Sequence, residues 1–261
     1  MTWITRQRSK LGALAAIRVG VGPSVTLLHG VGLNADAWGG QINELARHYS
    51  VIAFDMAGHG DSPAFTWNSP NLMDFVDAAR SDLDGPTVVI GHSMGAMIAL
   101  KLAEDPNVLG VVALNAIYRR SKSAHAAVHS RAKQLQDRAQ IDPLPTLKRW
   151  FDDLSSSEAI ACAQWLRAAS IKGYCAAYSV FANENGPTQA ELLGLAKPAL
   201  FMTGGLEPNS TPEMSIKMGE LCPMGQAHVI DDAAHMMPMT HAQDVNRKLL
   251  KFISQCYERE V

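Results

Sequence analysis

Six short runs of mainly apolar residues are spaced along the chain, and each predicts a buried β-strand. They cover residues 24–28, 50–54, 87–90, 109–114, 198–203 and 227–230. The runs are rich in Val, Ile and Leu and lack polar alternation, as expected of parallel strands covered on both faces. Helical periodicity lies between them, at about 36–48, 71–82, 94–104, 212–221 and 241–256. Strands that alternate with helices predict an α/β fold, a mostly parallel sheet with helices on both faces.

Residues 117–187 interrupt this alternation, because they carry helical patterns but no strand signal. This stretch holds ten Lys and Arg against six Asp and Glu, whereas the rest of the chain holds 13 against 19. A helical insert of different charge predicts a cap over one end of a sheet built from 1–116 and 188–261. A set of surface helices with a solvated basic face would give the same composition.

Composition narrows the classes of partner. The chain has 261 residues, of which 47% are hydrophobic and 18% charged, and its formal net charge is -2. We therefore expect no nucleic-acid partner. No apolar run reaches the length that spans a bilayer, so we expect no membrane partner. We expect a small-molecule substrate and a monomer or homodimer.

The first residues and the cysteines bear on cellular location. A short apolar stretch follows the basic start and is interrupted by Arg18, so it reads as a strand rather than a signal peptide. The four cysteines make no CxxC pair and no metal-ligand spacing. We expect reduced thiols in a cytoplasmic protein, with no metal and no cofactor. The cysteines are Cys162, Cys175, Cys222 and Cys256.

The strongest local signal for chemistry is the pentapeptide Gly-His-Ser-Met-Gly at residues 91–95, which follows one predicted strand and opens the next helix. A nucleophile on a sharp strand-to-helix turn needs small neighbours, because the backbone there is crowded. The helix N-terminus supplies N–H groups that suit a developing oxyanion. This context predicts Ser93 as a nucleophile.

A serine nucleophile needs a histidine base, and the base needs a carboxylate to orient it. His235 lies in a loop between the last predicted strand and the last predicted helix, whereas its rival His241 lies at the start of that helix, where a surface role fits better. Glu207 is the carboxylate in the loop after residues 198–203, and Glu213 lies inside the following helix. We therefore predict His235 as the base and Glu207 as the orienting acid.

An oxyanion hole requires two backbone N–H donors near the nucleophile. Met94, the residue after Ser93, should supply one. The glycine-rich loop after residues 24–28 should supply the other, and Val31 is our choice there. In the helical insert, Trp150 and Tyr174 are predicted to be walls of the substrate pocket.

Four segments together resemble the α/β-hydrolase family. They are LLHGVGLNADAW from residue 27, FDMAGHGDS at 54–62, GHSMG at 91–95 and AAHMMPM at 233–239. The resemblance implies an eight-stranded, mostly parallel sheet with a helical cap between strands six and seven. Two departures are Glu207, where many members have Asp, and Ala234, where Gly is frequent. The segments GYCAAYSVFA and STPEM are similar to enol-lactonase-like and small carboxylesterase-like members.

These features predict a cofactor-independent serine hydrolase that cleaves an ester, lactone or activated amide. The basic excess of residues 117–187 favours a carboxylate-bearing substrate. A carbon–carbon bond hydrolase is an alternative, although Met236 stands where such enzymes usually have Trp. A non-catalytic ligand receptor on the same fold is another. A dinucleotide-dependent oxidoreductase is more distant: residues 30–35 fit G-x-G-x-x-A, and Asp55 ends the next strand.

Overall fold

One sheet of eight strands lies at the centre of the computed structural model, which describes residues 3–64, 68–136 and 138–259. The strand order is β1-β2-β4-β3-β5-β6-β7-β8. The pairs β1–β2 and β2–β4 are antiparallel, and the other five pairs are parallel. The predicted α/β-hydrolase fold is confirmed. The strands are β1 (Ser9–Leu11), β2 (Leu14–Val19), β3 (Ser24–Leu28), β4 (Ser50–Phe54), β5 (Thr87–His92), β6 (Val108–Leu114), β7 (Ala199–Gly204) and β8 (Gly225–Ile230).

Apolar side chains cover both faces of the sheet. In β5, Val88 and Ile90 belong to one buried cluster and Val89 to the other, because successive side chains point to opposite faces. The first face packs on α1 (Gly39–Leu45) and α11 (Ala242–Glu258), and the second on α2 (Leu72–Arg80), α3 (Met94–Leu102) and α9 (Pro212–Leu221). This double coverage explains the unbroken apolar runs in the sequence.

The predicted helix at 36–48 is wrong in its detail. A 3-10 turn, η1 (Ala35–Trp38), comes first, and α1 ends at Leu45. The side chain of Asn34 accepts a hydrogen bond from the backbone N–H of Asp36 at 3.0 Å and so caps the turn. Two glycines, Gly39 and Gly40, open α1, and glycine favours the α-helix poorly. Two further short helices are α8 (Gln189–Gly194) and α10 (Met237–Thr240).

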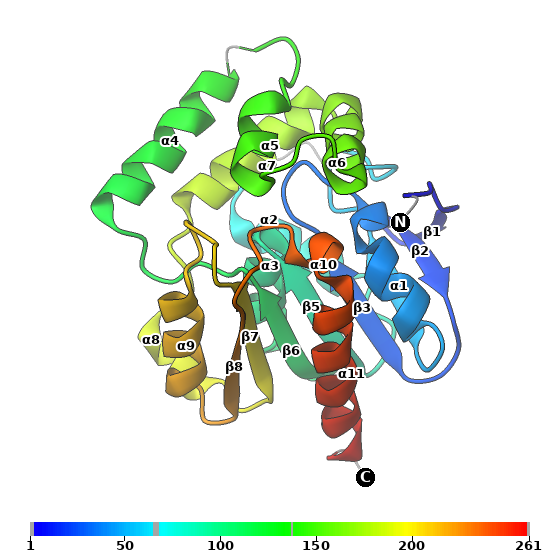
Figure 1. Cartoon of the computed structure of the whole chain (residues 1–261). Coiled ribbons are helices and arrows are strands. Elements are labelled where there is room, and N and C mark those ends of the chain that lie inside the picture. The colour runs from blue at the N-terminus through cyan, green and yellow to red at the C-terminus, as the bar shows by residue number, and fades with distance from the viewer. Residues whose placement is uncertain (1–2, 65–67, 137, 260–261) are drawn as a thin grey trace.

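Of the five described helices between β6 and β7, the first four lie within the residues predicted as an insert. They are α4 (Lys122–Gln136), α5 (Leu144–Trp150), α6 (Ser157–Ala168) and α7 (Ile171–Asn183). Figure 1 shows them gathered beyond one end of the sheet. Helix α7 touches the core backbone to backbone: a Cβ added to Gly173 would lie 2.2 Å from the carbonyl oxygen of Gly58. None of the described helices is long and apolar enough to cross a membrane.

Candidate active site

Ser93 sits on a sharp turn between β5 and α3. Its backbone is in a rarely occupied conformation, with φ 56° and ψ −116°. The flanking glycines are required by space: a Cβ on Gly91 would lie 2.0 Å from the carbonyl oxygen of Gly95, and a Cβ on Gly95 would lie 2.1 Å from that of Leu28. The turn therefore holds the Ser93 side chain at the carboxyl end of the central strands, where it lines a pocket.

The structure brings His235 and Glu207 together from loops after two neighbouring strands, β8 and β7. The His235 Nδ1 and the Glu207 Oε2 are 2.5 Å apart. The other carboxylate oxygen, Oε1, accepts hydrogen bonds from the backbone N–H groups of Asn209 at 2.7 Å and Ser210 at 3.4 Å. The Glu207 side chain is fully buried. Its position is thus fixed on both sides.

Burial alone would raise the pKa of Glu207. The nearby His235 and the hydrogen bonds from His235, Asn209 and Ser210 outweigh burial and lower the pKa to about 2. The carboxylate is therefore ionised at neutral pH and accepts the Nδ1 proton of His235. A carboxylate that accepts from Nδ1–H leaves Nε2 as the ring nitrogen that can take a proton.

Three residues outside the predicted set position His235. Its carbonyl oxygen accepts hydrogen bonds from the His92 ring Nε2 at 2.8 Å and from the Asn115 side-chain amide at 2.6 Å. Burial, helped by the His235 ring, lowers the pKa of His92 to about 3, so its ring is neutral. Asn115 in turn accepts a hydrogen bond from the Thr203 hydroxyl at 3.0 Å. The ends of β5, β6 and β7 are thus tied to the base.

Trp150, predicted as a pocket wall, stacks on the His235 ring with 5.6 Å between centroids and 20° between planes. Within the described chain no hydrogen bond joins the Ser93 hydroxyl to His235, although both residues line one pocket. Nucleophile and base are often further apart before substrate binds. The stacking places the base between the core and the helical insert.

The two predicted oxyanion donors, Met94 and Val31, belong to α3 and to the loop after β3. Met94 is the first residue of α3, where a helix leaves its N–H groups without partners inside the helix. Val31 lines the pocket. Its loop is fixed by two buried histidines: His59 Nε2 accepts from the Gly32 N–H at 3.0 Å, and His29 donates from Nδ1 to the Gly30 carbonyl at 2.8 Å.

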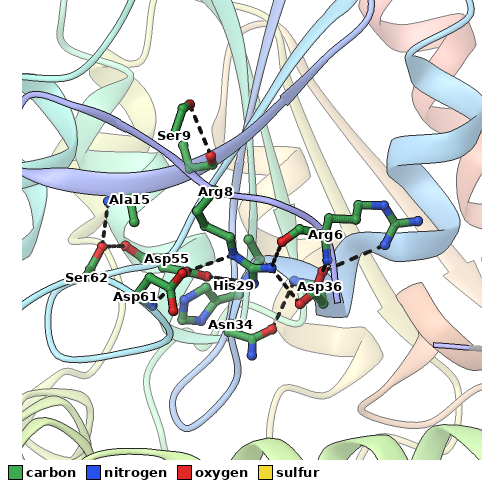
Figure 2. Close-up of polar contacts among 12 residues, drawn as sticks. Arg6, Arg8, Ser9, Ala15, His29, Asn34, Asp36, Asp55, Asp61 and Ser62 are labelled. Carbon is green, nitrogen blue, oxygen red and sulfur yellow. Dashed lines mark hydrogen bonds and ion pairs between the residues drawn. The ribbon is translucent and has the colours of Figure 1, made fainter. Parts of the chain in front are cut away.

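A buried ionic network lies behind this loop (Figure 2). Arg8 donates to both oxygens of Asp55, at 3.1 and 3.3 Å, and to Asp36 at 2.7 Å. Asp55 also accepts from the backbone N–H groups of Ala35 at 2.7 Å and Asp61 at 2.9 Å. Because both its oxygens are occupied inside the protein, Asp55 is a structural anchor and does not fit the ribose-binding role of the dinucleotide alternative.

The pocket and its mouth together enclose about 630 Å³ of space that is open to solvent on one side. Tyr174, the second predicted wall, lines it together with Phe181 and Tyr178. Three arginines of the insert reach it as well: Arg120, Arg131 and Arg149. A larger hollow of about 900 Å³ beside α3 and α8 contains none of the candidate catalytic residues, so size alone does not locate the site.

The rival candidates lie elsewhere. His241 immediately precedes α11 and is 3.4 Å from the Asp232 carboxylate, away from Glu207. His125 and His129 face each other along α4 at 3.2 Å and do not line the pocket. Among the described residues, no group of three or more His, Cys, Asp or Glu is placed to hold a metal ion. His92, Asn115 and the three arginines were missed, although the basic excess of the insert pointed to the arginines collectively.

Comparison with known proteins gives matches along most of the chain. A sequence model described as "Alpha/beta hydrolase family" matches residues 27–248. The (E)-2-((N-methylformamido)methylene)succinate hydrolase of Acinetobacter baylyi is 36% identical over 239 residues, which is 88% of this chain and 90% of that protein. The alignment thus covers nearly the whole of both chains.

Solved structures with the same fold include two hydrolases. An esterase from Thermogutta terrifontis, with malate bound, matches with a TM-score of 0.84 at 24% identity and covers 96% of this chain and 99% of that one. The enol-lactonase of Burkholderia xenovorans matches with a TM-score of 0.81 at 18% identity, covering 95% and 100%. At these identities the likeness concerns the fold.

Proposed function

Because this chain belongs to the alpha/beta hydrolase family, we propose that it is a serine hydrolase with Ser93 as nucleophile, His235 as base and Glu207 as orienting acid. The observation that carries the proposal is the 2.5 Å contact between His235 Nδ1 and Glu207 Oε2, with the base in the same pocket as Ser93. Such a carboxylate–imidazole pair next to a serine on a strained turn is the arrangement that activates a hydroxyl.

The proposed reaction is acyl transfer to water. His235 Nε2 takes the proton of Ser93 Oγ as this oxygen attacks the carbonyl carbon. The N–H groups of Met94 and Val31 stabilise the resulting oxyanion. His235 then gives its proton to the leaving group, and the carbon–leaving-group bond breaks to leave an acyl-enzyme. Water, deprotonated by His235, attacks the acyl-enzyme and releases the acid and free Ser93.

The helical insert, residues 117–187, acts in this proposal as a cap that selects the substrate. Arg131 donates to the Tyr178 hydroxyl at 3.1 Å, and Arg149 donates to the Thr146 hydroxyl at 3.1 Å. Neither guanidinium forms an ion pair within the described residues. Two pocket cations held by neutral partners favour a substrate that bears a carboxylate.

The bond that is cleaved is an ester, a lactone or an activated amide. The relative from Acinetobacter baylyi is named for a substrate that joins an N-methylformamido group to a succinate skeleton. That name supports an activated amide on a carboxylate-bearing compound as the first class to test.

The proposal is tested by hydrolysis of short p-nitrophenyl esters and of N-acylaminomethylene succinates, with Ser93→Ala as the comparison. Wild-type turnover, a fluorophosphonate label on Ser93 and loss of kcat by several orders of magnitude in Ser93→Ala are expected. Activity that survives in Ser93→Ala would overturn the assignment. Ligand binding without product release over many turnovers would favour the receptor alternative, and turnover of carbon–carbon substrates alone would favour that class of hydrolase.

A further inference from the structure

Arg120 is a buried cation on the wall of the pocket that contains Ser93 and His235. Only 8% of the residue is exposed. It directly follows Arg119, an exposed residue whose guanidinium lies over the Tyr118 ring. The neighbouring arginines thus differ: one faces solvent, and the other faces the pocket.

One side of the Arg120 guanidinium is held firmly. Its Nη1 donates to the carbonyl oxygens of Phe181, at 3.1 Å, and of Glu184, both at the C-terminal end of α7. The guanidinium carbon lies 4.4 Å from the centroid of the Phe181 ring. The C-terminal end of a helix carries partial negative charge, which favours a cation there. These contacts fix the side chain against α7.

The other side of the guanidinium lacks a partner. Nη2 is shielded from solvent and makes no hydrogen bond within the described part of the chain, and Arg120 forms no ion pair there. Burial lowers the pKa of Arg120 to about 10, and the charge of Arg131 also lowers it. The group is still protonated at neutral pH. A buried cation with an unused donor normally has an anionic partner.

We propose that Arg120 binds a second carboxylate of the substrate, apart from the one at Arg131 and Arg149, so that the site selects dicarboxylic compounds. This inference rests on the proposed function, because it concerns the same pocket. A carboxylate beside Arg120 supplies the counter-ion that its guanidinium lacks among the described residues.

The three cations are held at different points of the helical insert. Arg120 is fixed to the end of α7, whereas Arg131 lies on α4 and Arg149 on α5, each bonded to a hydroxyl. Like charges repel, so three guanidiniums around one pocket are best neutralised by more than one negative charge. A purely structural role for Arg120 would account for its Nη1 bonds but not for a buried charge on the pocket wall that has no ion-pair partner among the described residues.

The test measures binding to the inert Ser93→Ala protein by calorimetry, with succinate and butyrate as probes. The two acids have the same carbon chain and differ by one carboxylate. A charge-assisted hydrogen bond changes affinity by about 10- to 100-fold, so succinate is expected to bind that much more tightly than butyrate. Equal affinities for the two acids would overturn the proposal.

Variants in the same background locate the effect. Arg120→Gln should reduce the affinity for succinate to near that for butyrate and leave butyrate binding unchanged, and Arg120→Lys should restore part of it. Arg119→Gln, the same change at the exposed neighbour, should alter neither the affinity for succinate nor the affinity for butyrate. Preference for succinate that persists in a folded Arg120→Gln protein, checked by circular dichroism, would overturn the proposal. Because no turnover is required, this result is independent of whether Ser93 is labelled in the wild type.

Discussion

Replacing Glu207 with Gln removes the charge of the proposed acid while keeping its size. The carboxylate receives a proton donor on each side: His235 Nδ1 at Oε2, and the N–H groups of Asn209 and Ser210 at Oε1. An amide has only one acceptor oxygen. If its NH₂ faces His235, the imidazole is forced into the tautomer with the proton on Nε2, which cannot take a proton from Ser93. If its oxygen faces His235, the NH₂ group points at the backbone donors.

The first orientation disables the base, the second sets an NH₂ group against two N–H donors, and in both the imidazolium that forms during the reaction loses its counter-ion. Loss of the orienting carboxylate from a serine triad lowers kcat by about 10⁴-fold, or ~5 kcal/mol of transition-state stabilisation. Glu207→Asp is the matched control, because it keeps the charge but withdraws it by one C–C bond of about 1.5 Å. We expect that variant to lose about 100-fold, as for a misplacement of this size.

The assay is kcat/KM for a short p-nitrophenyl ester from pH 5 to 9, with circular dichroism to show that each variant is folded. Because the folded chain lowers the pKa of Glu207 to about 2, this group stays ionised throughout and adds no step to the wild-type profile. A Glu207→Gln protein that keeps more than a tenth of wild-type kcat/KM would refute the role of this carboxylate.

Three further predictions concern stability. Arg8→Met leaves the buried carboxylate of Asp55 without a cation and that of Asp36 with only Arg6, at 3.8 Å, so we expect the free energy of unfolding to fall by about 3 kcal/mol or more and the melting temperature by about 6 °C or more; an unchanged melting temperature would contradict the buried network. His29 and His92 have folded pKa values of about 3 against 6.5 in the unfolded chain, so the unfolded state binds the protons first as pH falls. The stabilisation from each neutral histidine is complete above pH 6.5 and is lost as the pH falls toward 3, with a loss of ~2 kcal/mol per histidine at pH 5. Equal melting temperatures at pH 7 and pH 5 would contradict this prediction. Gly173→Ala sets a Cβ 2.2 Å from the Gly58 carbonyl oxygen, which should lower the free energy of unfolding by about 1–3 kcal/mol. We also expect KM to rise while the fluorophosphonate probe still labels Ser93. Wild-type stability and a wild-type KM would show that the contact is not tight.

The sheet could be predicted from sequence because its strands are buried on both faces, which leaves continuous apolar runs such as residues 87–90. The turn at Ser93 could be predicted because only glycine fits at positions 91 and 95, and this requirement appears in the sequence as the Gly-x-Ser-x-Gly motif. The extent of the helix after Asn34 was not predictable, because helical periodicity does not separate a 3-10 turn from the α-helix that follows it.

The residues that position the base could not be predicted, since their contacts join distant parts of the chain. His92 and Asn115 reach the His235 carbonyl across 143 and 120 residues, and neither has a local pattern that marks it. The basic excess of residues 117–187 indicated a role for cations. Which of them line the pocket depends on how α4, α5 and α7 pack, as the contrast between Arg119 and Arg120 shows.

The backbone contact between Gly58 and Gly173 has a consequence for protein engineering. It divides the helical insert into a fixed part, α7, whose docking tolerates no added side chain, and an exchangeable part, residues 122–149, which holds α4 and most of α5. Grafting a different segment between Ser121 and Trp150 replaces Arg131 and Arg149 and so removes the two pocket cations proposed to bind the substrate carboxylate. The graft retains the turn at Ser93, the stacking of Trp150 on His235, and the hydrogen bonds that hold Arg120 to the C-terminal end of α7.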